Sequence, residues 1–303
     1  MSLIHSHFFN FAFETFIYHI HIVSKMPLTS DLKLDASKFK PDAISQQTKD
    51  FNAQLIKIME GGPKWYEVGA RKYREMRWNG ETPLPKPVVL DSGKNIELPS
   101  RDSGRKIPCR VFVPENGKPK GVFYHIHGGG WVLQSEHFQD VMLKYLADHC
   151  QLAVVSVGYR LAPEDPYPKG NEDCFDVGEY LVDKSEKDYG GPLMFMGGDS
   201  AGGHLSVLTA FHLLKTRPDF AFKGLILNFG AYDLSGFLPQ AHTFDLPLVL
   251  DVDIMEKFIR TQSLIAMPHM LTLTDTSKPT CQVLTKSNGG ICGYRRSLLI
   301  LQS

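Results

Sequence analysis

The chain has 303 residues, of which 43% are hydrophobic and 22% are charged, a composition typical of one globular domain with a self-sufficient core. Lysine plus arginine equals aspartate plus glutamate at 33 each, so no net electrostatic field draws the chain to nucleic acid or to an anionic membrane. The composition therefore favours a small, weakly charged molecule as the partner and leaves the oligomeric state open.

Residues 1–25 are apolar in character, but polar side chains interrupt them. Ser6, Asn10, Glu14 and four histidines break the run, so it does not predict a membrane span. No basic segment precedes the apolar part, which argues against a signal peptide. We interpret these residues as a non-native leader and expect the native chain to begin at Met26.

The cysteines argue for free thiols. Their number is odd, they are widely spaced and no pair has CxxC spacing. This pattern argues against both a disulfide framework and a zinc site. The sequence thus predicts a reducing, cytoplasmic location and no metal or organic cofactor. The five positions are Cys109, Cys150, Cys174, Cys281 and Cys292.

Residues 26–80 have mostly helical periodicity, with an apolar face formed by Phe51, Leu55, Ile58 and Met59. Short β-rich pieces follow, and two Asp-Ser-Gly clusters of turn-forming residues separate them. We expect antiparallel strands there, at one edge of a sheet. The pieces are residues 88–90, 96–98 and 110–113.

After Gly121, apolar strands alternate with amphipathic helices, the pattern of a parallel sheet built from crossover units. Ser135 is placed to cap the first helix, whose predicted apolar face is Phe138, Val141, Met142, Tyr145 and Leu146. A second helix surrounds Cys174, Val177 and Leu181, and a third carries Leu205, Leu208, Phe211 and Leu213. The predicted strands are residues 122–126, 153–157, 193–196 and 224–229.

A G-x-S-x-G motif lies between a predicted strand and a predicted helix. It reads Gly198, Asp199, Ser200, Ala201 and Gly202. A serine on such a sharp turn projects its oxygen above the sheet, and small neighbours allow close backbone packing. The N–H groups at the start of the next helix point towards a developing oxyanion. A plain tight turn is the alternative, but this context favours a nucleophile at Ser200.

A second motif, HGGGW, follows the strand of residues 122–126 directly. It consists of His127, Gly128, Gly129, Gly130 and Trp131. Three consecutive glycines present backbone N–H groups that no side chain shields, and these can bind a tetrahedral oxyanion. Alone they would indicate a flexible loop. Paired with the serine motif, they indicate an oxyanion hole.

The third motif, residues 158–168, follows the strand of residues 153–157 and is rich in proline. Arg160 and Glu164 stand in it. A guanidinium is a poor proton-transfer group at neutral pH, so we interpret the two as a structural ion pair at the rim of the site.

HGGGW, YRLAPEDPYP and GDSAGGH, in this order, resemble the hormone-sensitive-lipase-like (α/β-hydrolase fold-3) family of esterases. The resemblance implies an α/β-hydrolase fold with a helical cap. It also implies Ser200 as nucleophile, with the N–H groups of Gly128, Gly129 and Ala201 as the oxyanion hole. His127, Gly130, Gly198, Asp199 and Gly202 support the motifs. By the same resemblance, residues 26–80 form the N-terminal cap segment, and 81–270 form the core with a cap insertion at about 238–267.

The rest of the catalytic machinery is not found in the sequence. In this fold the acid and then the histidine follow the nucleophile, each after a further strand. Residues 271–303 contain no histidine and no clear series of strand, acid and helix, so we expect an aberrant tail from truncation or frame-shift, with the last strands missing. We assign neither Asp233 as the acid nor any downstream histidine as the base. Those histidines are His204, His212, His242 and His269.

Two functions remain open at this point. The first is a serine carboxylester hydrolase for short or medium acyl esters, bound in a pocket lined by Trp131 and the cap helices, with impaired catalysis in this chain. The second is a non-catalytic, receptor-like binder of a small molecule, because relatives of the family keep the fold and pocket while losing the histidine.

Overall fold

The computed structural model describes residues 35–232, 234, 242, 246, 248–263 and 297–301. The chain divides into two units, residues 1–49 and 50–303. In the first unit, the 3-10 helices η1 (Ala36–Phe39) and η2 (Pro41–Ala43) precede α2 (Gln46–Met59), which continues into the second unit. The Asp35 side chain accepts a hydrogen bond from the Ser37 N–H at 3.0 Å and so caps η1.

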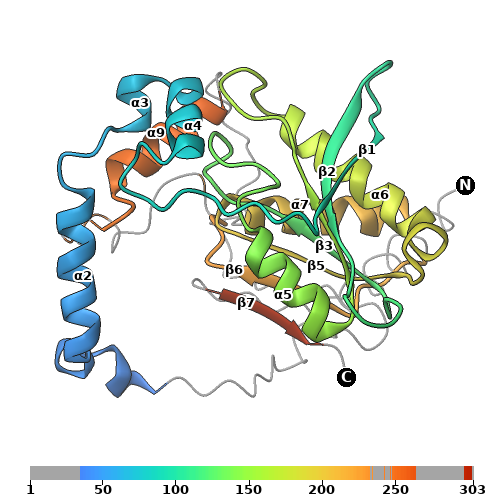
Figure 1. Ribbon diagram of the computed structural model, residues 1–303, viewed down its shortest axis with the longest axis horizontal. Helices are drawn as coiled ribbons and strands as arrows, with labels where there is room; N and C mark the ends of the chain where they lie inside the picture. The colour runs from blue at the N-terminus through green and yellow to red at the C-terminus, as the bar shows by residue number, and fades with distance from the viewer. Residues whose placement is uncertain are drawn as a thin grey trace, which may run out of the picture. The chain divides into compact units, whose positions relative to one another are not determined.

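The second unit is built on a seven-stranded sheet with the order β1-β2-β4-β3-β5-β6-β7 (Figure 1). The four strands β4, β3, β5 and β6 are parallel, whereas β1 and β2 pair antiparallel at one edge and β7 pairs antiparallel with β6 at the other. This arrangement confirms the predicted mostly parallel sheet with an antiparallel edge. The strands are β1 (Lys94–Pro99), β2 (Lys106–Phe112), β3 (Val122–Ile126), β4 (Ala153–Val157), β5 (Leu193–Asp199), β6 (Gly224–Asn228) and β7 (Ser297–Leu301).

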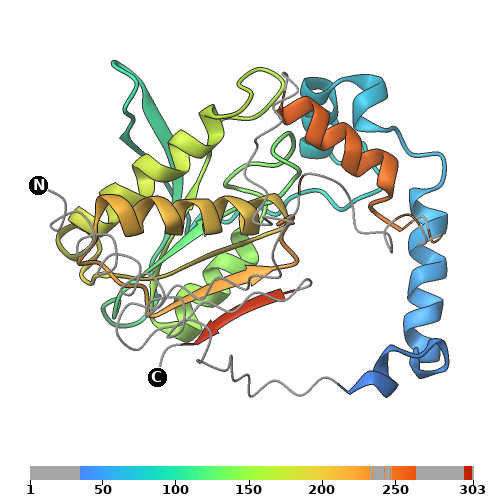
Figure 2. The same cartoon turned by 180° about the vertical axis from the view of Figure 1, so that it is seen from behind.

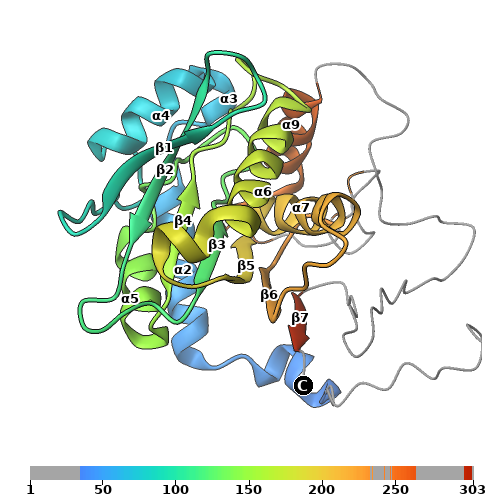
Figure 3. The same ribbon diagram turned by 90° about the vertical axis from the view of Figure 1, so that its right-hand side faces the viewer.

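Helices cover both faces of the sheet, as the edge-on view in Figure 3 shows for α5 (Asp140–Cys150) on one face and α6 (Lys169–Tyr189) and α7 (Ala201–Thr216) on the other. Because strand side chains alternate between faces, β3 contributes to two cores. Tyr124 packs in the core beneath α6 and α7, whereas Phe123 packs with Leu143 of α5. Burial on both faces accounts for the mostly apolar composition of β3 and β4, whose polar residues His125 and Ser156 contact each other at 2.9 Å.

The register of the parallel strands brings the three sequence motifs to the same end of the sheet, where these strands terminate. Ile126, the last residue of β3, pairs with Val157 on one side and with Gly198 on the other. HGGGW, the rim loop (defined here as residues 158–168) and the serine turn therefore all begin at the same level, at the carboxyl ends of neighbouring strands.

Helices α3 (Trp65–Val68), α4 (Ala70–Asn79) and α9 (Val252–Gln262) lie together at this end of the second unit (Figure 2). The Trp65 ring stacks on Phe258 with centroids 4.8 Å apart, and the Tyr66 hydroxyl donates to Asp253 at 2.7 Å. Asp251 caps α9 by accepting from the Ile254 N–H at 2.7 Å. Helix α9 lies in the stretch that the sequence predicted as a cap insertion.

Three local predictions were wrong. Residues 88–90 are not a strand, because Leu90 gives its N–H to Asp140 at 2.9 Å and its carbonyl to Arg110 at 2.6 Å instead of to a neighbouring strand. Ser135 does not cap α5, since the residue before the helix is Gln139. The predicted apolar face of α5 is also incorrect, because its buried residues are Asp140, Leu143 and Ala147, whereas Val141, Met142 and Tyr145 are exposed.

The described part of the segment 271–303 is the strand β7, although no strand was recognised there from the sequence. It runs antiparallel to β6, from Gly224 opposite Leu301 to Asn228 opposite Ser297. The rest of this segment lies outside the described residues, as do residues 1–34.

Within the described ranges, no helix is both long and apolar enough to cross a membrane. Cys109, Cys150 and Cys174 are free thiols, as predicted, whereas Cys281 and Cys292 lie outside the described residues.

A buried ion pair on the α5 face of the sheet provides a test of the fold. Arg110 and Asp140 are joined by a 2.5 Å contact with side chains only 5% and 0% exposed, so Asp140→Asn leaves a buried guanidinium without its counter-charge. We expect this change to lower the free energy of unfolding by about 3–5 kcal/mol in urea denaturation. The control is Glu97→Gln in the exposed Lys106–Glu97 pair, where we expect a loss under about 1 kcal/mol. Equal effects of the two changes would contradict this account.

Candidate active site

Ser200 stands at the turn between β5 and α7. Its backbone has φ 53° and ψ −117°, a strained conformation for a residue with a side chain. Its N–H donates to the Asn228 carbonyl at 2.9 Å, and its carbonyl accepts from the His204 N–H at 3.1 Å. The turn is therefore held by β6 on one side and by the first turn of α7 on the other, which is the strand-turn-helix context predicted for Ser200.

Glycines on either side of Ser200 let the turn approach the end of β3. A Cβ atom at Gly198 or at Gly202 would lie 2.0 Å from the Ile126 carbonyl oxygen, and one at Gly202 would also lie 2.7 Å from the His127 carbonyl oxygen. Only residues without a side chain can make these approaches. The G-x-S-x-G turn and the HGGGW motif thus pack backbone against backbone.

The HGGGW motif forms a tight turn beside the serine. Gly129 and Gly130 have φ of 98° and 61°, values that side chains rarely tolerate, and the Val132 N–H donates to the Gly129 carbonyl at 3.1 Å. A Cβ atom at Gly128 would lie 2.5 Å from the Asp199 carboxylate. The glycine turn, defined here as residues 128–132, is therefore in direct contact with the residue that precedes Ser200.

Asp199 turns its side chain towards the glycine turn and α5. Burial raises the pKa of Asp199, and hydrogen bonds from Gln139 and from the backbone N–H groups of Asp199 and Gly128 oppose this rise. The Gln139 amide donates to the carboxylate at 3.0 Å. Sequence reasoning missed Gln139, and no local pattern marks it, because its role depends on a contact with a distant strand end.

The buried side chains of His127 and Tyr159 support the glycine turn on its core side. Their rings stack with centroids 4.2 Å apart, and the Tyr159 hydroxyl donates to the His127 carbonyl at 3.0 Å. Burial lowers the pKa of His127 to about 4, because it disfavours the imidazolium. His127 is thus a neutral packing residue in a motif that fixes the turn.

The histidines after Ser200 have other surroundings. His204 is buried on α7, where its ring meets Trp131 edge-on at 5.4 Å and burial lowers its pKa to about 4. His212 contacts Glu179 at 2.7 Å and stacks on Phe175. His242 is exposed. His269 and Asp233 lie outside the described residues.

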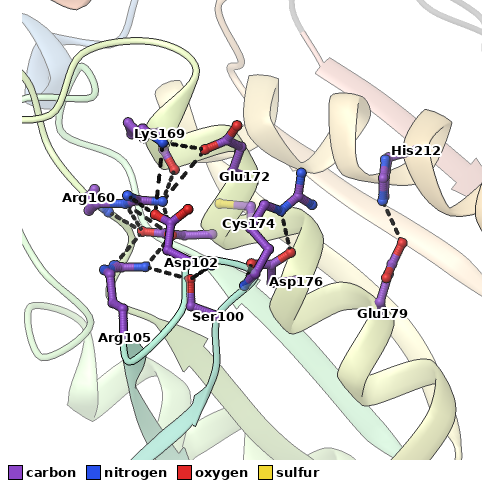
Figure 4. Close-up of polar contacts among 12 residues, drawn as sticks. Ser100, Asp102, Arg105, Arg160, Lys169, Glu172, Cys174, Asp176, Glu179 and His212 are labelled. Atoms are coloured by element: carbon purple, nitrogen blue, oxygen red, sulfur yellow. Dashed lines mark hydrogen bonds and ion pairs between the residues drawn. The ribbon is translucent and has the colours of Figure 1, made fainter.

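Arg160 and Glu164 were predicted to pair with each other, and this prediction was wrong. Arg160 contacts Asp173 at 2.8 Å and Asp102 at 2.6 Å, in the cluster drawn in Figure 4, which also contains Arg105. Glu164 instead contacts Arg74 of α4 at 2.5 Å. Both residues anchor the rim loop, as expected, but to α6 and α4. The Asp173 side chain is fully buried, so its partners are fixed by the need to compensate a buried charge.

A small cavity, partly open to solvent, lies between the glycine turn, the rim loop and α9, and Ser200 is not among its lining residues. Trp131, Tyr159 and Gln262 are among its lining residues. Trp131 was expected to line the pocket of an ester hydrolase. Among the described residues, no group of three or more histidine, cysteine, aspartate or glutamate side chains could hold a metal ion.

Comparison with known proteins identifies the family of the chain. The model of an α/β-hydrolase fold family matches residues 123–300, which is more than half of the chain. Carboxylesterase NlhH of Mycobacterium tuberculosis is 36% identical over 160 residues, 50% of this chain and 48% of that protein. Rabbit (Oryctolagus cuniculus) arylacetamide deacetylase is 40% identical over 145 residues, 45% of this chain and 35% of that protein.

The chain belongs to the hormone-sensitive-lipase-like α/β-hydrolase fold-3 family. A solved hyperthermophilic esterase from the archaeon Pyrobaculum calidifontis supports the α/β-hydrolase fold with a TM-score of 0.61 and 26% identity, over 78% of this chain and 74% of that one. The chain spans about half the length of the curated relatives it matches. In this α/β-hydrolase the predicted residues Ser200, Ala201, Gly128 and Gly129 come together at one end of the sheet, with Gly130, Gly198, Gly202, His127 and Asp199 around them.

The close packing of the two motifs predicts a severe effect of one methyl group. In Gly202→Ala the new Cβ atom would meet two backbone carbonyls that cannot rotate away, so we expect a loss of about 2–3 kcal/mol in the free energy of unfolding. In the matched control Gly190→Ala, the Cβ atom meets nothing within 4 Å, and only the left-handed backbone costs about 1 kcal/mol. A Gly202→Ala protein as stable as the Gly190→Ala control would contradict the observed contact.

The buried histidines predict a pH-dependent stability. Burial lowers the pKa of His204 and His127 to about 4, and of His125 to about 3, from about 6.5 in the unfolded chain. Between pH 6.5 and 4 the unfolded chain binds protons that the folded chain does not. The contribution of these histidines to the free energy of unfolding is therefore fully present above pH 6.5. It decreases as the pH falls, by up to about 1.4 kcal/mol per pH unit for each histidine.

Urea denaturation from pH 7.5 to 5 measures this slope. His204→Leu removes one of the three groups, so the slope of its unfolding free energy should be shallower than that of the parent protein. Identical slopes in the two proteins would show that His204 is not held neutral by the fold.

Proposed function

We propose that this chain is a serine carboxylester hydrolase for short or medium acyl esters, with Ser200 as the nucleophile. The observation that carries the proposal is the contact between the serine turn and the glycine turn, in which Gly198 and Gly202 approach the end of β3 and Gly128 approaches Asp199. Membership of a family that includes esterases supports it, as do relatives described as an arylesterase and a carboxylesterase.

The proposed chemistry proceeds through an acyl-enzyme. The Ser200 oxygen attacks the ester carbonyl carbon, and the carbonyl electrons move to its oxygen. The tetrahedral oxyanion collapses, the bond to the alcohol oxygen breaks, and the alcohol leaves with a proton. Water then attacks the acyl-serine and releases the acid. Backbone N–H groups stabilise the oxyanion in both halves because they are aimed at the charge before it forms.

The amides available for the oxyanion can be ranked from their surroundings. Gly128 lies against Asp199, since a Cβ atom at Gly128 would be 2.5 Å from the Asp199 carboxylate. Gly129 and Gly130 donate no backbone hydrogen bond to another described residue, and Ala201 begins α7, where N–H groups have no helical acceptor. We therefore assign the N–H groups of Gly129 and Ala201 as donors, and we keep the N–H group of Gly128 as the third.

No general base for Ser200 is assigned among the described residues. His204 faces Trp131 in the core and His212 faces Glu179, so neither is oriented towards Ser200 as a base. Without a paired base, a serine hydrolase retains activity only about 10³ to 10⁴ fold above water, through oxyanion stabilisation and binding. We expect slow hydrolysis by the 303-residue chain.

A fluorophosphonate reagent tests this function directly, because it phosphonylates a serine that is backed by an oxyanion hole. Because no base is assigned to Ser200, we expect slow labelling that is confined to Ser200, as identified by peptide mass spectrometry, and no adduct in Ser200→Ala. Hydrolysis of a p-nitrophenyl butyrate probe should be slow and equally dependent on Ser200. Ser206, a buried serine one and a half turns further along α7, provides the control, because Ser206→Ala should keep the adduct.

Three other outcomes would change the proposal. An adduct at a different serine, or labelling that survives in Ser200→Ala, would overturn the assignment of the nucleophile. Rapid hydrolysis would point to a base among the remaining histidines, with His269 the first to replace. Absence of both labelling and hydrolysis, with tight binding of a small ligand, would favour a receptor-like function instead.

A further inference from the structure

One guanidinium connects helix α4 to the glycine turn and to the rim loop. Arg74 lies on α4, and its side chain is 22% exposed. Its Nη1 donates to the Val132 carbonyl at 2.7 Å and to the Ala162 carbonyl at 3.4 Å. Its Nη2 donates to the Glu164 carboxylate at 2.5 Å. A single side chain thus binds the glycine turn once and the rim loop twice.

Arg74 binds one carbonyl of the glycine turn, that of Val132, and one of the rim loop, that of Ala162. The Val132 N–H donates to the Gly129 carbonyl at 3.1 Å, so the Val132 residue joins the turn to Arg74. The Ala162 N–H donates to the Trp131 carbonyl at 3.0 Å, so the rim loop is bonded to the same turn directly. Arg74 and this bond together form a closed ring of contacts around the last residues of the turn.

The neighbouring Arg71 is a useful comparison, because it contacts the same Glu164 only as an exposed ion pair. It reaches Glu164 at 3.8 Å and is 78% exposed, so it contributes little. Arg74 differs because it donates to two backbone carbonyls as well as to Glu164. Hydrogen bonds from a charged donor are stronger than those between neutral groups, and the rigid planar fork of a guanidinium holds several acceptors in one fixed geometry, unlike the ammonium of lysine.

We propose that Arg74 is a positioning residue for catalysis: it fixes the glycine turn and the rim loop against each other, so that the backbone amides beside Ser200 keep their aim at the oxyanion. This inference rests on the proposed function. In this proposal α4 does more than form part of the helical cap, because it also positions the glycine turn through Arg74. Displacement of such amides by about 1 Å can cost about a hundredfold in rate.

The experiment measures phosphonylation of Ser200 by a fluorophosphonate in the full chain, resolved into kinact and KI, for the parent, Arg74→Ala, Arg74→Lys and Arg71→Ala. We expect kinact to fall about ten- to a hundredfold in Arg74→Ala with KI little changed, because the amides act on the transition state. Arg74→Lys should give a smaller loss, and Arg71→Ala should match the parent within twofold. Methylguanidinium at a non-denaturing concentration should partly restore kinact in Arg74→Ala.

Amide hydrogen exchange provides a readout that does not need activity. Exchange should quicken in residues 129–133 and 159–164 of Arg74→Ala and stay unchanged in Arg71→Ala. An unaltered kinact in folded Arg74→Ala, or an equal loss in Arg71→Ala, would overturn the proposal. If the parent is not labelled at Ser200, the proposed function fails, and unchanged exchange in Arg74→Ala would then overturn the positioning role separately. If Arg74→Ala does not fold, Arg74→Lys carries both measurements, and parent-like values in it overturn the proposal.

Discussion

The site depends on the close approach of two backbones at the end of β3. Gly198 and Gly202 each come so near the Ile126 carbonyl that a Cβ atom would lie 2.0 Å from it. This contact requires glycine on both sides of Ser200, and it forces the chain to turn sharply between β5 and α7. The strained backbone of Ser200, with φ of 53°, is the local consequence. The rest of the structure holds these segments in place.

Several layers of contacts stabilise that approach. Stacking of His127 on Tyr159 supports the glycine turn from the core, and the Gln139 amide holds Asp199 from the α5 side. The rim loop is tied to α6 through Arg160 and the buried Asp173. Each contact uses a charge or polar group that would be costly to bury alone, so the partners stabilise each other only while the loops keep their positions. These contacts therefore fix the loops at the carboxyl ends of the strands to one another.

The sequence predicted the parts of the fold that depend on local pattern. β3 and β4 have the predicted bounds because both are short, mostly apolar segments, and Ser200 was predicted as the nucleophile because strand, turn and helix adjoin in the sequence. What failed depends on distant partners. Residues 88–90 have strand-like side chains, but their backbone groups bind Arg110 and Asp140. The same buried Asp140 reverses the predicted face of α5, since a charge at a core position cannot be recognised without Arg110. Arg74 and Gln139 could not be predicted for the same reason.

The central claim is that the backbone amides beside Ser200 are arranged to receive an oxyanion. A crystal structure of the phosphonylated chain tests it most directly, because the phosphonyl oxygen occupies the place of that charge. The account predicts a covalent bond to the Ser200 oxygen, with the phosphonyl oxygen about 2.7–3.1 Å from the amide nitrogens of Gly129 and Ala201. A phosphonyl oxygen turned to solvent, with no backbone amide within hydrogen-bond distance, would contradict it.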